Sequence, residues 1–190
     1  DTVELQCAAR DHVPLRTRAG VVSMTELVRS SMRLRPDRVV VGEVRGAEAL
    51  DMLLAMNTGH EGSLATIHGN APRDALDRLV TLAMMAEERL SNEALVKMVA
   101  RTIELVLQLR FEPRTGRRRL VSIFEVTGLE GDVITGNDLW GLDPAQGRTC
   151  QGLGKAPGQG NGEAARRAPR RVGRGVERSP GWAGTAFGAG

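Results

Sequence analysis

The feature that most constrains the fold is a strand–helix–strand pattern between residues 38 and 69. The run RVVVGEV (38–44) is rich in β-branched residues and is bounded by turn formers, and GSLATIHG (62–69) is a second short apolar run. The segment between them, AEALDMLLAMNTG (47–59), has helical periodicity and ends on Gly59. This pattern predicts an α/β fold in which the two strands are parallel neighbours, each buried on both faces.

Other segments continue the alternation of strands and helices. We expect strands at 2–7 and 13–18, helices at 23–36, 70–88 and 91–103, and a β-hairpin with strands at 103–111 and 117–129. The first of these helices should begin with a capping box, in which the N-cap Ser23 pairs with Glu26, and should stop at Pro36. The second should begin at an Asn70 cap with a proline in its first turn.

Composition divides the chain near Leu142. Residues 141–190 hold 13 of the 23 glycines and four of the eight prolines. Residues 144–190 carry a net charge of +6, so that residues 1–143 are about −3 when the whole chain is +3. We predict a folded domain at 1–143 and a disordered Gly/Arg/Pro-rich tail at 144–190. The basic pI comes from this tail, which we interpret as solvated rather than as an arm for nucleic acid or acidic lipid.

The sequence predicts neither a disulfide nor a membrane span. Cys7 and Cys150 lie in dissimilar contexts, which favours a reduced cytosolic compartment. No apolar run approaches the ~18 residues of a membrane-spanning helix. The chain begins at Asp1 inside a strand-like segment and without a methionine, so we expect it to be a fragment whose N-terminal part is missing.

Polar side chains follow the two apolar runs. Glu43 comes at the end of the first run and His68 at the end of the second. Ligands of parallel sheets bind beyond the carboxyl ends of strands. A nucleotide hydrolase needs a carboxylate there to orient or deprotonate water and to help hold Mg²⁺, and a histidine there can contact a γ-phosphate. Taken singly, Glu43 is better explained as a surface glutamate at a strand end and His68 as a structural histidine, and only their neighbours favour the functional interpretation. A zinc site at His60 and His68 with Glu61 has unsuitable spacing and lacks a further ligand.

Arginines form a second group of candidates. Arg29 and Arg33 are spaced i, i+4 and share a helix face, and Arg45 follows Glu43 by two residues. Guanidinium groups contact phosphate within a subunit or act as arginine fingers across an interface. The alternative is a solvated helix face.

These residues together resemble a known family. The stretch from Leu27 to Leu79, and above all GEVRGAEALDMLLAMNTGHEGS, closely resembles the CpaF/TadA-like ATPases of pilus assembly and secretion, within the type II/IV secretion traffic-ATPase superfamily. The resemblance implies part of a RecA-like P-loop NTPase core with C-terminal helices and a β-hairpin. It further implies ATP and Mg²⁺ as cofactors and a homo-hexameric ring with ATP at the subunit interfaces.

The resemblance also assigns roles to residues of this chain. DTVEL matches the family's acidic box, which implies that Asp1 and Glu4 help to place Mg²⁺ and the lytic water. Glu43 matches the Walker B glutamate, and GHEGSLATIH matches the histidine box. His68 then faces phosphate, with His60 as its partner at the start of the box and Thr66 beside it. Arg29 and Arg33 match arginines that contact phosphate or sense a neighbouring subunit.

One expected part is missing from the sequence. A P-loop requires G-x-x-x-x-G-K-[ST] between a strand and a helix. The two lysines of the chain, Lys97 and Lys155, lie in a helical segment and in the Gly-rich tail, and neither has this context. The absence fits the expected truncation and predicts that this chain alone is inactive.

The sequence therefore predicts ATP hydrolysis that powers Flp/Tad-type pilus assembly or protein secretion in the intact protein. We expect a cytoplasmic protein, peripheral at the inner face of the cell membrane, whose partners are pilus or secretion platform proteins. The open alternatives are a type IV secretion or conjugation ATPase, a non-catalytic interaction module that lacks the P-loop, and nucleic-acid binding through the tail.

Overall fold

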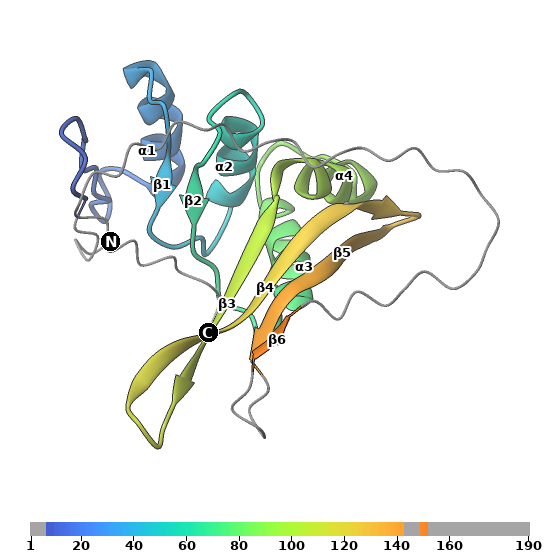
Figure 1. Cartoon of the computed structure of the whole chain (residues 1–190). Coiled ribbons are helices and arrows are strands. Elements are labelled where there is room, and N and C mark those ends of the chain that lie inside the picture. The colour runs from blue at the N-terminus through green and yellow to red at the C-terminus, as the bar shows by residue number, and fades with distance from the viewer. Residues whose placement is uncertain (1–6, 143–148, 152–190) are drawn as a thin grey trace.

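The computed structural model describes residues 7–142 and 149–151 (Figure 1). Its elements, in chain order, are α1 (Met24–Ser31), the 3-10 turn η1 (Met32–Leu34), β1 (Val40–Val41), α2 (Glu48–Met56), β2 (Leu64–Ala65), α3 (Pro72–Ala83), α4 (Asn92–Thr102), β3 (Leu105–Glu112), β4 (Arg117–Glu130), β5 (Val133–Leu142) and β6 (Thr149–Gln151). The α/β class predicted from the sequence is confirmed.

The strands form two separate sheets. β1 and β2 are parallel, with Val40 opposite Leu64 and Val41 opposite Ala65, as the strand–helix–strand pattern predicted. The second sheet has the order β3-β4-β5-β6 and its pairs are antiparallel. The predicted hairpin is its β3–β4 pair. β5 was not predicted, and it pairs with β4 around a turn at Gly131, whose φ of 60° lies in the left-handed region.

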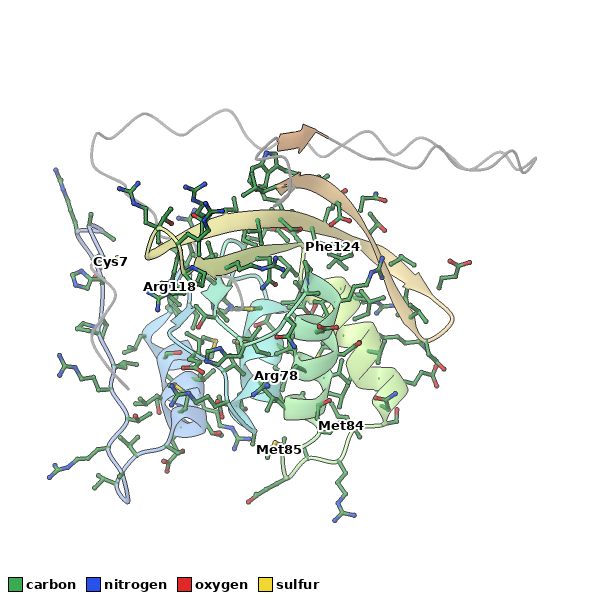
Figure 2. The ribbon with its side chains drawn as sticks, turned by 90° about the horizontal axis from the view of Figure 1, so that it is seen from below. Cys7, Arg78, Met84, Met85, Arg118 and Phe124 are labelled. Atoms are coloured by element: carbon green, nitrogen blue, oxygen red, sulfur yellow. The ribbon has the colours of Figure 1, made fainter. Side chains whose placement is uncertain are left out.

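The hydrophobic core lies between the helices and one face of the antiparallel sheet. Figure 2 shows the helices gathered on one side of this sheet. Leu53 on α2 and Val99 on α4 are fully buried, and Phe124 on β4 packs into the same cluster. Arg73 on α3 places its guanidinium 5.0 Å from the centroid of the Phe124 ring and donates a hydrogen bond to the Ile134 carbonyl at 3.0 Å. The core thus joins the two halves of the described chain.

Several local predictions are confirmed. Ser23 and Glu26 form the capping box of α1, with the Ser23 amide donating to the Glu26 carboxylate at 2.7 Å. The helix ends in η1 before Pro36. Gly59 follows α2 with φ of 98°, a conformation that favours glycine.

Other predictions were wrong. Residues 13–18 form no strand, and Arg18 makes only an isolated bridge to Val22. The N-cap of α3 is Ala71, not Asn70, because the residue before Pro72 is pushed into an extended conformation, and no side chain caps this helix. α3 ends at Ala83, short of the predicted residue 88. The parallel strands are not buried on both faces, since Val40 and Leu64 are each 49% exposed.

The terminal predictions fall largely outside the described residues. The strand at 2–7 does so except for Cys7, which is not in a strand. Of the predicted tail, only Thr149–Gln151 is described, and it forms β6 against β5 rather than disordered chain. In the ranges that the structure does describe, no helix is both long and apolar enough to cross a bilayer.

Candidate functional site

The site lies where β1 and β2 end side by side. Beyond the strands, the Val44 amide donates to the Thr66 carbonyl at 2.9 Å, and the Thr66 hydroxyl donates to the Gly42 carbonyl. The parallel pairing therefore continues past β1 and β2 and holds Glu43 beside the segment that leads to His68. Both residues lie at the carboxyl edge, as the sequence predicted.

Glu43 is held between a histidine and an arginine. Its Oε1 lies 3.0 Å from Nε2 of His68, and its Oε2 accepts a hydrogen bond from the Arg45 guanidinium. The Glu43 side chain is 24% exposed, whereas those of His68 and Arg45 are each 63% exposed. The carboxylate is thus the sheltered member of a three-residue cluster that opens to solvent.

The electrostatics of this cluster keep Glu43 ionised. Its hydrogen bond with Arg45 holds the pKa of the Glu43 carboxyl below its usual value, against the opposing effect of burial, and the nearby His68 lowers it further. A carboxylate in this state accepts hydrogen bonds from a water molecule and orients it. Its lowered pKa makes it a weaker proton acceptor than an isolated glutamate.

The start of α2 fixes the backbone that follows Glu43. Ala47, the N-cap, offers no side-chain acceptor, and Glu48 in the first turn instead binds the backbone that precedes the helix. Its Oε1 accepts from the amides of Arg45 at 2.6 Å and Gly46 at 2.9 Å. The negative charge of the Glu48 carboxylate also interacts favourably with the positive N-terminal end of the helix dipole. Glu48 was not among the predicted site residues, although an acidic residue in the first turn of a helix is a usual signal of a helix start.

The site is anchored from the antiparallel sheet as well. Gln108 on β3 is buried and donates from Nε2 to the carbonyl of Gly69 at 3.1 Å. Gly69 directly follows His68, and a Cβ at this glycine would lie only 3.0 Å from the backbone of Ala75 on α3. The loop that carries His68 is therefore pressed between β3 and α3.

A groove of about 650 Å³ opens in front of Glu43. One wall consists of Glu43, Arg45 and Glu48, and the other consists of the segment 17–24, which bears Arg18, together with Glu26 on α1. The volume of the groove lies in the range of small-molecule sites. The second wall was not predicted from the sequence, because segment 17–24 has no regular pattern.

Of the other predicted site residues, some lie near Glu43 and others lie elsewhere. Thr66 lies in the cluster through its bond to Gly42. His60 lies at the other end of α2, where its Nδ1 donates to the Ala55 carbonyl at 2.8 Å. His60 therefore closes the C-terminal end of α2.

The two predicted arginines differ from each other. Arg29 binds Asp51 on α2 at 2.7 Å and Glu88 at 2.9 Å, and these carboxylates raise its pKa further. In this conformation Arg29 ties α1 to α2 and to the segment after α3. Arg33, in η1, is exposed and has no ion pair with another described residue.

The described part of the site can supply only a small number of protein ligands to a magnesium ion. Among residues 7–142 and 149–151, no three His, Cys, Asp or Glu side chains lie close enough to bind a metal together. Glu43 offers one carboxylate, which matches the preference of Mg²⁺ for one or two carboxylates with waters and substrate phosphates. Asp1 and Glu4, the other predicted acidic residues, lie outside the described residues.

Comparison with known proteins decides the family. The sequence profile of the type II/IV secretion system protein family matches residues 1–123. The chain belongs to this family. The resemblance drawn from the sequence is thereby confirmed at the level of the type II/IV secretion ATPases.

Curated relatives come from conjugation and type IV secretion. The chain is 47% identical over 118 residues to a probable conjugal transfer protein TrbB of Sinorhizobium fredii (62% of this chain, 34% of the relative). It is 43% identical over 131 residues to TrbB of Rhizobium radiobacter (69% and 38%) and 35% identical over 119 residues to the type IV secretion system protein PtlH of Bordetella pertussis (61% and 35%). The chain therefore spans about a third of the length of these relatives.

A solved structure shares the fold. The VirB11 ATPase from the Brucella suis type IV secretion system, solved in complex with sulphate, aligns with a TM-score of 0.52 at 23% identity. The alignment covers 55% of this chain and 32% of that chain. The likeness shows that the aligned part of the chain has the VirB11-like fold.

Proposed function

We propose that this chain is the water-orienting half of an ATPase site in a type II/IV secretion motor. The observation that carries the proposal is the cluster of Glu43, His68 and Arg45 at the carboxyl ends of two parallel strands, of which Glu43 and Arg45 line a groove. When bound, Mg²⁺ would neutralise charge on the phosphates of ATP. Glu43 orients the attacking water, and Arg45 and His68 hold the carboxylate in place. We further propose that His68 contacts the γ-phosphate, as the match to the family's histidine box implies.

The phosphate-binding half must come from elsewhere in the intact protein. Lys97, the one lysine among the described residues, forms an i, i+4 ion pair with Glu93 on α4. Neither a P-loop lysine nor its loop amides are supplied by this chain. We therefore propose that the chain hydrolyses no ATP by itself and that the intact protein does.

The biological role proposed here follows the curated relatives. The names of TrbB and PtlH support transfer through a type IV secretion system more than Flp-type pilus assembly. CpaF/TadA-like pilus assembly stays as the alternative. In either role we propose a homo-hexamer that works in the cytoplasm at the inner face of the cell membrane, with secretion platform proteins as partners.

Replacement of Glu43 in the intact protein tests the enzymatic proposal. Glu43→Gln keeps the side-chain shape and removes the charge that orients water, so the steady-state rate of ATP hydrolysis should fall by about 10²–10⁴-fold. Glu61→Gln is the matched control, because Glu61 is exposed and lies away from the groove. Wild-type turnover by the Glu43→Gln protein would rule the proposal out.

A further inference from the structure

The β3–β4 hairpin carries a concentration of positive charge that the ATPase proposal does not use. Its outer part, residues 110–119, reads RFEPRTGRRR and has five arginines and one glutamate, a net charge of +4. The remainder of residues 1–143 is about −7, because that whole segment is −3. Figure 1 shows this end of the hairpin extending past the helices, and Figure 2 labels Arg118 on it.

Most of these arginines are not paired within the described chain. Glu112 is the single acidic residue of the hairpin end, and it binds Arg119 at 3.1 Å and the Thr115 hydroxyl at 2.6 Å. Arg110, Arg114, Arg117 and Arg118 are exposed and have no ion pair with any other described residue. Arg110 lies directly opposite Arg119 in the strand register, an arrangement of like charges that destabilises a sheet. An anionic partner would remove this repulsion.

The charges surround the hairpin end instead of lining one face. Side chains alternate along a strand, so Arg110, Arg117 and Arg119 lie on one face of the ribbon. Arg118 lies on the opposite face, beside Phe111, and Arg114 lies in the turn. This distribution suits a layer of lipid headgroups, which surrounds an inserted hairpin end on every side. A two-stranded ribbon also fits the major groove of DNA, so the choice between the two partners rests on the exposed Phe111.

Phe111 adds a second property that suits a membrane. Its side chain is 55% exposed although it is a large apolar residue, and it is directly opposite Arg118. Aromatic rings favour the boundary between headgroups and acyl chains, and arginines bind lipid phosphates with more than one hydrogen bond.

We propose that the hairpin end, residues 110–119, binds the surface of an anionic phospholipid bilayer. The arginines bind headgroup phosphates, and Phe111 enters the boundary with the acyl chains. The acidic remainder of the domain stays away from the bilayer, because the hairpin holds it at a distance. This proposal deepens the membrane-peripheral location proposed above, but it is tested without ATP, so that failure of lipid binding and failure of hydrolysis are told apart.

Vesicle sedimentation with the full 190-residue chain tests the proposal. Vesicles of phosphatidylglycerol and phosphatidylcholine are compared with vesicles of phosphatidylcholine alone. The hairpin variant Arg114→Gln/Arg117→Gln/Arg118→Gln should lower partitioning onto phosphatidylglycerol by about fivefold per arginine, on the order of 100-fold in all. The control Arg166→Gln/Arg167→Gln/Arg170→Gln removes the same charge from the basic tail and should cost at least about tenfold less. An equal loss in both variants, or a smaller one in the hairpin variant, overturns the proposal.

Two further variants and one alternative probe sharpen the result. Arg→Lys at the same three hairpin positions should weaken partitioning much less than Arg→Gln, because the charge that attracts the anionic surface is kept and only the second hydrogen bond of each guanidinium is lost. Phe111→Ala should weaken partitioning several-fold, whereas Val133→Ala, at the exposed β4–β5 turn, should leave it unchanged. Tighter binding of a short DNA duplex than of phosphatidylglycerol vesicles, lost in the same hairpin variant, would overturn the lipid proposal in favour of nucleic acid.

Discussion

At the scale of single residues, the proposed ATPase role depends on the contacts that position the Glu43 carboxylate. The sequence placed Glu43 and His68 at strand ends, and both are there, within 3.0 Å of each other. It could not show that Arg45 turns back onto Glu43, because that contact depends on the turn that Glu48 fixes before α2. The match of Arg29 to a phosphate-contacting arginine also did not reveal its bonds to Asp51 and Glu88, since these partners are distant in the chain.

The contacts of Glu43 predict a pH-dependent contribution to stability. Its pKa lies below the ordinary value of 4.5 because Arg45 and His68 favour the ionised form. This contribution is complete above the unfolded-state pKa and is lost as the pH falls through the lowered folded-state pKa. The free energy of unfolding of wild type should therefore exceed that of Glu43→Gln above about pH 4.5, and the difference should shrink at lower pH. Urea titrations at several pH values measure it, with Glu61→Gln as the control. A difference that grows on acidification would contradict the assignment.

At the scale of elements, features specified by local sequence signals were predicted better than features that depend on long-range strand pairing. The capping box of α1 and the hairpin turn were readable because each is specified within a few residues. β5 was missed, since VITGNDLWGL includes two glycines and little alternation. Its place depends on β4, where bulges at Ile123/Phe124 and Val126/Gly128 adjust the register. The pairing of β4 with β5 brings Gly136 beneath the Phe124 ring.

Gly136 gives a test of this pairing. A Cβ at Gly136 would lie 2.2 Å from the Glu125 carbonyl oxygen and 2.4 Å from the Phe124 ring. Gly136→Ala should therefore destabilise the protein by about 1–3 kcal/mol through overpacking. Gly141→Ala on the same strand is the matched control, because its Cβ would lie 4.0 Å from the Val121 carbonyl oxygen, which is an ordinary van der Waals contact. Thermal or urea unfolding compares the two, and equal stability would mean that the close Phe124–Gly136 packing is wrong.

At the scale of the whole molecule, the chain is proposed to supply one side of an ATPase site. The parallel strand pair, α2 and the cluster around Glu43 were predictable, because the family's sequence signature covers all of them. The exposure of Val40 and Leu64 was not predictable. Burial of a strand on both faces requires neighbouring elements that the described residues do not supply. The chain spans about a third of its relatives, and the proposed motor activity belongs to the intact protein.

A single-turnover experiment on the intact protein tests the central claim most directly, because it separates ATP binding from the chemical step. Radiolabelled ATP is mixed with excess enzyme and Mg²⁺, and conversion to ADP is followed over time. We predict that the Glu43→Gln protein binds ATP about as tightly as wild type but converts the bound nucleotide at least about 10²-fold more slowly. Conversion of bound ATP at the wild-type rate by Glu43→Gln would contradict the assignment of Glu43 as the residue that orients the attacking water.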